Sequence, residues 1–153
     1  MDLSPDWVVG FVDGEGCFYV GFTEHPEMTA GYQVLPEFRV VQHKRDIHVL
    51  HGLKRFFRHG VVRQNHEDRW ELRVRKLDGL KQVVSFFRKH PLKTKKAVDF
   101  QKFARIVYWM EKRKHLSIEG LLEMVKYAQG MNTAASKRLK EIESDLLGKL
   151  SKG

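Results

Sequence analysis

The segment WVVGFVDGEG, from Trp7 to Gly16, combines an apolar helical pattern with glycines and an acidic end. Ser4 followed by Pro5 is typical of a helix start, because serine caps free backbone amides and proline is tolerated in the first turn. Glycine destabilises a helix interior by about 1 kcal/mol, so Gly10 and Gly14 need a structural reason. They lie on one side of the helix, where the missing Cβ atoms let another backbone approach closely. Two such glycines in one short segment favour a packing contact there, and the alternative is that both are tolerated by chance.

The composition is that of a folded domain without a membrane span. The chain has 153 residues, of which 42% are hydrophobic. Its apolar runs are shorter than the ~18 residues that a spanning helix needs, and its first residues lack the basic segment of a secretory signal. The lone Cys17 excludes a disulfide framework and a cysteine-rich zinc site. We expect an intracellular protein with no membrane partner, located in a prokaryotic cytoplasm or in an organelle matrix or stroma.

The net charge points to a polyanionic partner. The chain carries 28 Lys and Arg against 19 Asp and Glu, which gives a formal net charge of +9. A positive field of this size attracts nucleic acid, but an unrelated basic protein has the same balance. The position of the basic residues in the fold must therefore distinguish a nucleic-acid-binding protein from an unrelated basic protein.

The hydrophobic periodicity predicts a mixed α+β module in the order helix, strand, strand, helix, strand, strand, helix. We expect a helix from Ser4 that Gly14 and Gly16 stop, strands over 17–24 and 32–42, a helix over 46–59, strands over 61–64 and 69–75, and a helix from Asp78 that Pro91 breaks. Further helices are expected over 94–115, 117–129 and 133–147. We assign residues 1–130 to a single domain and residues 131–153 to a C-terminal helical extension of it.

The strand RWELRVR, residues 69–75, separates apolar from basic residues. Trp70, Leu72 and Val74 share one face, while arginines and Glu71 share the other. The strand over 32–42 shows the same split and the strand over 17–24 shows it more weakly, so we expect one sheet with an apolar back and a solvated polar front. Such a front reaches base edges in a major groove, although an ordinary solvated sheet face alternates in the same way. The candidate DNA contacts on the strands are Gly21, Thr23, Gln33, Glu37, Arg39, Arg63, Arg69, Glu71, Arg73 and Arg75.

The string VVGFVDGEG, Val8 to Gly16, resembles the nine-residue signature of the LAGLIDADG homing endonucleases. Val9 stands in place of the usual alanine and Glu15 in place of the second aspartate. The predicted order of elements over residues 4–130 is similar as well. The resemblance implies an αββαββα fold with a saddle-shaped DNA-binding sheet. It also implies site-specific cleavage of double-stranded DNA by an intron-encoded enzyme.

The resemblance also implies a homodimer. In this family two copies of the motif helix pack together, whereas this chain has one copy and residues 76–90 contain no second. A single copy implies twofold symmetry and a long pseudo-palindromic target. Val9, Gly10, Asp13 and Gly14 are the expected interface residues. Asp13 is also expected to bind helix-end backbone amides rather than a metal.

The resemblance assigns the catalytic metal to Glu15, one from each subunit. Carboxylate oxygens suit Mg²⁺, which can activate water and stabilise the leaving oxygen of a phosphodiester. We expect Mn²⁺ to substitute and Ca²⁺ to support binding without cleavage. The alternative is that Glu15 simply ends a helix.

Two further segments resemble the family. In FRVVQHK, residues 38–44, Gln42 falls where a polar residue orders the active-site water network. In PLKTKKA, residues 91–97, Lys95 falls where a lysine approaches the metal-bound water or the scissile phosphate, and it could stabilise negative charge there. The alternative is a solvated helix start, but clustered lysines at a helix N-terminus repel the helix dipole unless an anion joins them.

Other functions remain open at this point. The same fold serves non-cleaving DNA-binding proteins and maturases, for which intron RNA is the partner. A generic RNA-recognition sheet would expose aromatic residues on its central strands, and the polar face of residues 69–75 has none. Lys137, beside Arg138 and Lys140, belongs either to a solvated helix face or to an additional phosphate-binding surface.

Overall fold

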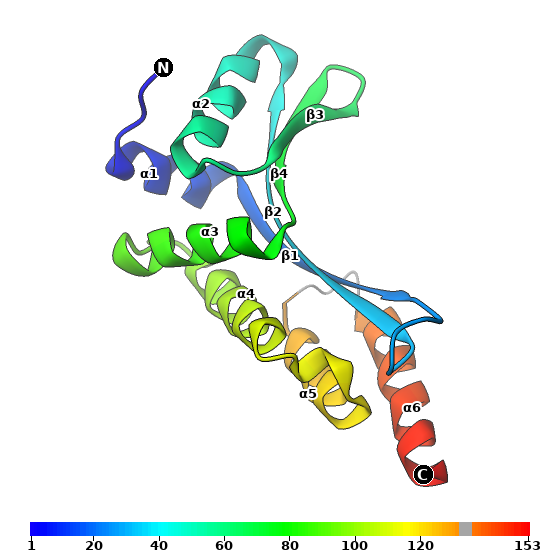
Figure 1. Cartoon of the computed structure of the whole chain (residues 1–153). Helices are drawn as coiled ribbons and strands as arrows, with labels where there is room; N and C mark the ends of the chain where they lie inside the picture. Colours follow the sequence, from blue (N-terminus) through cyan, green and yellow to red (C-terminus); the bar gives the residue numbers. More distant parts are fainter. Residues whose placement is uncertain (132–135) are drawn as a thin grey trace. The chain divides into compact units, whose positions relative to one another are not determined.

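The computed structural model describes residues 1–131 and 136–153, and it has the predicted α+β fold (Figure 1). Its first seven main elements follow the order αββαββα, and further helices complete the chain. The elements are α1 (Pro5–Glu15), β1 (Gly16–Glu24), β2 (Tyr32–His43), η1 (Lys44–Asp46), α2 (Ile47–Phe57), β3 (Val61–His66), β4 (Arg69–Val74), α3 (Leu77–Lys89), α4 (Lys96–Glu111), η2 (Lys114–Leu116), α5 (Ile118–Ala128) and α6 (Ser136–Lys152).

The strands of the described residues form one sheet in the order β1-β2-β4-β3. Strand β4 is antiparallel to both of its neighbours, and its register places Arg39 opposite Arg73 and Val40 opposite Leu72. Since side chains alternate along a strand, the arginines share one face and the apolar residues the other. The separation predicted from residues 69–75 is therefore present.

The chain divides into two compact units, of which the first comprises Met1–Phe18 and Glu37–Gln101. In this unit α2 packs on β3 and β4 and against α3 (Figure 1). Phenylalanines dominate its core: the ring centroids of Phe18 and Phe38 are 5.3 Å apart, and those of Phe87 and Phe100 are 5.8 Å apart. Tilted and edge-on aromatic contacts of this kind stabilise beyond the area they bury.

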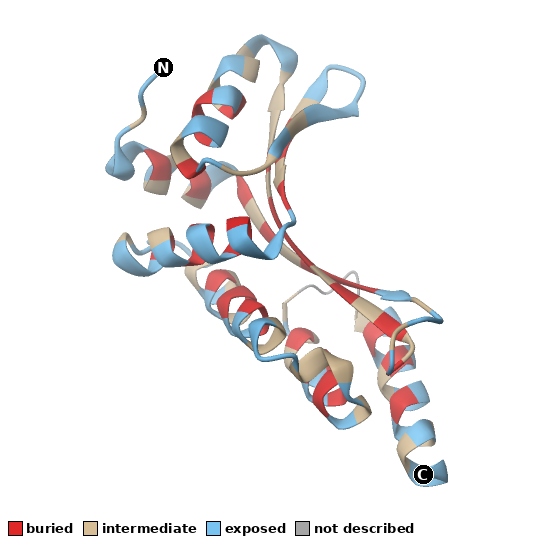
Figure 2. Cartoon of the chain, in the orientation of Figure 1, coloured by how far each residue is buried: buried red, intermediate tan, exposed pale blue. Residues whose placement is uncertain are grey.

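The second unit comprises Tyr19–Pro36 and Lys102–Gly153. Helix α6 buries Leu139, Ile142 and Leu146, whose spacing gives it one apolar face (Figure 2). The charged helix expected over 133–147 thus reaches Lys152, and residues 133–135 of that expectation lie outside the described residues. The domain boundary at residue 130 stays a prediction.

One predicted helix ends earlier than expected. The periodic pattern predicts a helix over 94–115, but α4 ends at Glu111. Arg113 adopts a left-handed conformation with φ 62°, which an α-helix cannot contain, and η2 follows it. Hydropathy shows the apolar spacing but not this local backbone reversal.

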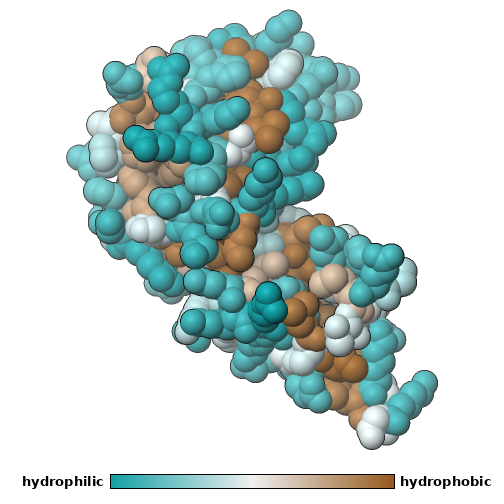
Figure 3. All heavy atoms as spheres, viewed as in Figure 1, coloured by the Kyte–Doolittle hydropathy of each residue, from teal (hydrophilic) through white to brown (hydrophobic). Residues whose placement is uncertain are grey.

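Hydrophilic side chains cover most of the face seen in Figure 3. In the part of the chain that the structure describes, no helix is long and apolar enough to cross a membrane.

Candidate active site and nucleic-acid interface

The motif helix α1 is fixed at both ends by short-range contacts. Ser4 caps its start, since the backbone amide of Trp7 donates to the Ser4 hydroxyl oxygen at 3.3 Å. Gly16 ends it in an extended conformation, where an added Cβ would lie 2.6 Å from Cγ1 of Val12. Glycine is therefore required at position 16, and it leaves the exposed Glu15 as the last helical residue.

The two predicted catalytic residues Glu15 and Gln42 are in contact. Nε2 of Gln42, near the end of β2, donates to Oε2 of Glu15 at 3.4 Å. Gln42 therefore reaches the end of the motif helix, and its role in ordering active-site water stays a prediction.

The end of α1 suits a divalent cation. The carbonyl end of a helix carries partial negative charge, and the last turn of α1 contains no basic residue of its own, although Nζ of Lys96 donates to the Val12 carbonyl there. Glu15 adds a carboxylate, whose hard oxygens are the ligands that Mg²⁺ prefers. Within residues 1–131 and 136–153, no group of three His, Cys, Asp or Glu side chains could hold a metal ion.

Asp13 binds backbone amides, which is one of the two roles predicted for it. The other, at a dimer interface, stays a prediction. Its Oδ2 accepts from the backbone amide of Lys93 at 2.7 Å, and its Oδ1 accepts from the hydroxyl and the amide of Thr94 at 2.8 and 3.2 Å. Burial by itself would raise the pKa of Asp13, but these hydrogen bonds and the nearby Lys96 outweigh it and lower the pKa below its usual value. The aspartate is therefore held as a carboxylate.

The contacts of Asp13 bring the lysine-rich segment to the motif helix. Nζ of Lys96 donates to the backbone oxygen of Val12 at 3.2 Å, so this lysine has a partner within the chain. Lys95 is exposed and lies between Lys96 and the Asp13-bound Thr94. The segment that contains Lys95 is thus attached to Asp13, two residues before Glu15 in the motif helix. This attachment is compatible with the predicted role of Lys95.

The polar sheet face is only partly solvated. Among the predicted DNA contacts, Thr23, Arg63, Arg69, Arg75 and Lys137 are exposed, and Gln33, Arg39 and Arg73 are half-buried.

The expectation of a solvated front is wrong at Gly21, Glu37 and Glu71, which are buried. A Cβ on Gly21 would lie 3.2 Å from Cε1 of Tyr19, whose ring occupies the adjacent space. Glu37 is covered by arginine side chains, and Oε1 of Glu71 accepts from the side-chain amide of Asn65 at 3.0 Å. DNA contacts by these residues stay predictions.

Two of the predicted interface residues, Gly10 and Gly14, lie on an open part of α1, whereas Asp13 contacts Lys93 and Thr94. Cβ atoms added to Gly10 and Gly14 would meet no atom of the described residues within 4 Å, apart from their own chain neighbours and nearby helix backbone. On the same helix Trp7 is 41% exposed and stacks on Phe11, with ring centroids 4.7 Å apart. Val9 is half-buried. This face has room for a second backbone.

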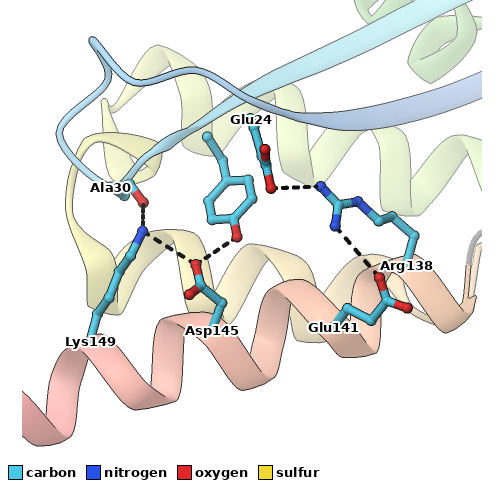
Figure 4. A network of polar contacts seen from close by, with 7 residues as sticks. Glu24, Ala30, Arg138, Glu141, Asp145 and Lys149 are labelled. Carbon is cyan, nitrogen blue, oxygen red and sulfur yellow. Dashed lines mark hydrogen bonds and ion pairs between the residues drawn. The ribbon is translucent and has the colours of Figure 1, made fainter.

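Sequence reasoning missed a polar network between α6 and the β1–β2 hairpin (Figure 4). The Tyr32 hydroxyl donates to Oδ2 of Asp145 at 2.6 Å, and Nζ of Lys149 lies 3.3 Å from the same oxygen and 3.2 Å from the backbone oxygen of Ala30. Burial, and then the bond to Asp145, raises the pKa of Tyr32 to about 12. Asp145 and Lys149 are four residues apart, so their contact on one face of a helix could be predicted from the sequence. That spacing does not predict that Tyr32 binds the same carboxylate.

Comparison with known proteins decides the family. Residues 8–107 match the family model described as LAGLIDADG endonuclease, a range that covers most of the motif helix, the whole sheet and most of α4. The chain belongs to the LAGLIDADG endonuclease family. It is 62% identical to the homing endonuclease I-TnaI, whose crystal structure superposes with a TM-score of 0.92 over 95% of this chain and 99% of that one.

Two other relatives are longer than this chain. A Neurospora crassa protein described as probable intron-encoded endonuclease 2 is 30% identical over 97% of this chain, which spans 36% of that protein. The I-SmaMI LAGLIDADG homing endonuclease, solved bound to cleaved DNA, is 28% identical with a TM-score of 0.89. That match covers 95% of this chain and 49% of the I-SmaMI chain.

Proposed function

We propose that this chain is a site-specific DNA endonuclease that cuts a long pseudo-palindromic duplex site as a homodimer and requires Mg²⁺. The contact between Glu15 and Gln42, at the end of the family motif helix, carries this proposal. It joins an exposed carboxylate at a helix C-terminus to an amide from a neighbouring strand. The attached segment that contains Lys95 adds a cation.

Duplex DNA is the proposed partner. The net charge of +9 and the exposed arginines on one sheet face favour a polyanion. I-SmaMI and I-LtrWI, which share this fold, were solved with cleaved and target DNA respectively. Phosphate contacts should supply most of the affinity, and base contacts from the sheet should supply the sequence preference.

The homodimer is supported by the open face of α1 around Gly10 and Gly14. This chain matches about half of the I-SmaMI chain, so two copies would supply a comparable amount of protein. Twofold pairing through α1 would place the two Glu15 carboxylates near one axis.

Each residue has a separate proposed role. Glu15 from each subunit would hold Mg²⁺, which when bound supplies an activated water and charge stabilisation for phosphodiester hydrolysis. Gln42 orients the Glu15 carboxylate through its amide. Lys95 stabilises negative charge on the phosphate. Mn²⁺ is expected to substitute, and Ca²⁺ to permit binding without cleavage.

The test is cleavage of a library of DNA duplexes by purified protein with Mg²⁺, followed by the same assay on Glu15→Gln. The variant keeps the size of the side chain and removes its charge, so cleavage should be lost while a gel shift in Ca²⁺ persists. Glu119→Gln, which removes an exposed carboxylate from α5, is the charge-matched control and should still cut.

The outcomes separate the alternatives. Sequence-selective binding without cleavage by the wild-type protein would favour a non-cleaving DNA-binding protein. Preference for intron RNA over duplex DNA would favour a maturase. Cleavage by Glu15→Gln at the wild-type rate would remove Glu15 from the mechanism.

A further inference from the structure

Glu37 lies among the arginines of the polar sheet face, but its side chain is only 6% exposed. Its Oε1 accepts a hydrogen bond from Nε of Arg75 at 2.8 Å. Nε of Arg73 lies 3.9 Å from the same oxygen, and Nη1 of Arg39 lies 3.6 Å from Oε2. One buried carboxylate therefore contacts guanidinium groups from β2, from β4 and from the residue after β4.

The strand register explains why a carboxylate is needed here. Arg39 and Arg73 lie directly opposite each other in the antiparallel β2–β4 pair. Like charges in that position repel, and a carboxylate between them offsets the repulsion. A buried carboxylate is in turn unfavourable unless cations and donors surround it. Glu37 and its arginines therefore depend on one another.

The arginines can still donate hydrogen bonds to a further partner. Three guanidinium groups share one carboxylate, so the cluster retains positive charge. The side chains of Arg75 and Arg39 are 51% and 35% exposed. A guanidinium has five N–H donors in a rigid fork, and the bond from Arg75 Nε to Glu37 uses one of them. The rest of the fork suits a phosphate or the O6 and N7 acceptors of guanine.

We propose that Glu37 is a positioning residue for DNA recognition, which fixes Arg75, Arg39 and Arg73 in the orientation that reads the major groove. The inference rests on the proposed function, because it assumes that this sheet face meets DNA. It differs from direct base readout by Glu37, in which the carboxylate would accept from a base amino group. The arginines cover that carboxylate and argue against direct readout.

The test compares Glu37→Gln with the wild type on single-base-pair variants of a duplex that the wild-type protein selects. The glutamine keeps the shape of the side chain and removes the charge that holds the arginines. Discrimination at the bases read by the arginines should fall by about 5- to 160-fold, the range of one base contact. Binding to non-cognate duplex should be unchanged or stronger, because the cluster becomes more positive.

A double-mutant cycle separates positioning from direct readout. If Glu37 acts through Arg75, then at the base position that Arg75 reads the double variant loses no more discrimination than Arg75→Ala alone. At the positions read by Arg39 and Arg73, Glu37→Gln should keep its own effect in the Arg75→Ala background. Glu37→Asp, which restores a carboxylate, should recover part of the discrimination. Glu119→Gln makes the same change of charge on α5 and should keep the wild-type preference.

Several results would overturn the inference. Wild-type discrimination by Glu37→Gln at every position would do so, as would an effect of Glu37→Gln that simply adds to that of Arg75→Ala at the base position that Arg75 reads. If Glu37→Gln does not fold, Arg39→Gln and Arg75→Gln carry the test. Sharing one carboxylate predicts overlapping, non-additive effects for this pair, and separate additive effects would contradict it.

A measurement without DNA keeps this inference distinct from the proposed function. The Nε–H signal of Arg75 in nitrogen-labelled free protein should be protected from exchange in the wild type and in Glu37→Asp, and it should lose protection in Glu37→Gln. Failure of the wild type to select any duplex would refute the proposed function. Equal exchange of Arg75 Nε–H in all three proteins would refute the positioning role.

Discussion

The carboxylate of Asp13 accepts two hydrogen bonds from Thr94, one from its hydroxyl at 2.8 Å and one from its backbone amide at 3.2 Å. The Thr94 hydroxyl oxygen in turn accepts from the backbone amide of Lys96 at 3.3 Å, at the start of α4. The end of the motif helix α1 and the start of α4 are therefore linked through one threonine. This link holds the segment of Lys95 beside the motif.

Replacing Asp13 with alanine should destabilise the first unit. Loss of a side chain that binds helix-end amides costs about 1 kcal/mol, and Thr94→Val should cost little more once Asp13 is gone. Urea denaturation of both single variants and the double variant measures the coupling. Asp2→Asn, at an exposed residue before α1, is the control. Additive losses for Asp13 and Thr94 would show that the two side chains act independently.

The acid stability of the protein should also depend on Asp13. Its pKa is lower in the folded chain than the unfolded value of 3.8, so its contribution is present above pH 3.8 and is lost as the pH falls through the folded pKa. The free-energy difference between wild type and Asp13→Asn should therefore shrink in acid. Paired urea titrations at neutral and acid pH measure it, and a constant difference would contradict the cause assigned here.

Gly10→Leu should weaken self-association through α1. A side chain at this open position would separate two helices that pack there, and overpacking of a close contact costs about 1–3 kcal/mol. Gly148→Leu is a matched control, because a Cβ at Gly148 on α6 also meets no other described atom within 4 Å. Sedimentation equilibrium should show weaker dimerisation for the first variant alone. Equal dimerisation of both variants would place the interface elsewhere.

The fold followed from the sequence because its elements are marked by local signals. Ser4 and Pro5 begin α1, and the alternation in residues 69–75 separates the two faces of β4. The burial of Glu37 did not follow, because alternation assigns a face but not the long side chains that cover it. The contact of Asp13 with Thr94 joins residues far apart in the chain, and local pattern does not report it.

The catalytic assignments came from the family resemblance. The structure supports the assignment of Gln42 more directly than that of Lys95. Gln42 contacts Glu15 directly. The segment of Lys95 is attached to Asp13 through its neighbours, and this places its backbone rather than its flexible side chain. Lys95 lies in the turn before α4, so substitution of the side chain is the direct test of its role.

Lys95→Met should slow cleavage while leaving DNA affinity almost unchanged. The methionine keeps the length of the side chain and removes the charge proposed to stabilise the phosphate. Lys93→Met is the matched control, since Lys93 is exposed in the same segment and its bond to Asp13 comes from the backbone. Single-turnover cleavage and gel shifts separate rate from affinity. A loss of affinity with an unchanged cleavage rate would reduce Lys95 to a phosphate contact.

The Tyr32–Asp145 bond should make the second unit sensitive to alkali. Burial, and then the bond to Asp145, raises the pKa of Tyr32 from 10.0 to about 12, so the folded chain favours the neutral hydroxyl. A raised pKa contributes stability that is complete below pH 10.0 and is lost as the pH rises through about 12. Tyr32→Phe removes both the bond and the titration.

At neutral pH, Tyr32→Phe should therefore be less stable than the wild type by about 0.5–1.5 kcal/mol, the net value of one hydrogen bond. The difference should shrink between pH 10.0 and about 12, because the wild-type chain alone loses the contribution of Tyr32. Hydrogen exchange of the hairpin between β1 and β2, followed over this range, measures the local effect. Tyr108→Phe, at a tyrosine that is 43% exposed, removes a hydroxyl without breaking this bond and serves as the control. If the two phenylalanine variants show the same pH dependence, the bond to Asp145 does not hold the hairpin to α6.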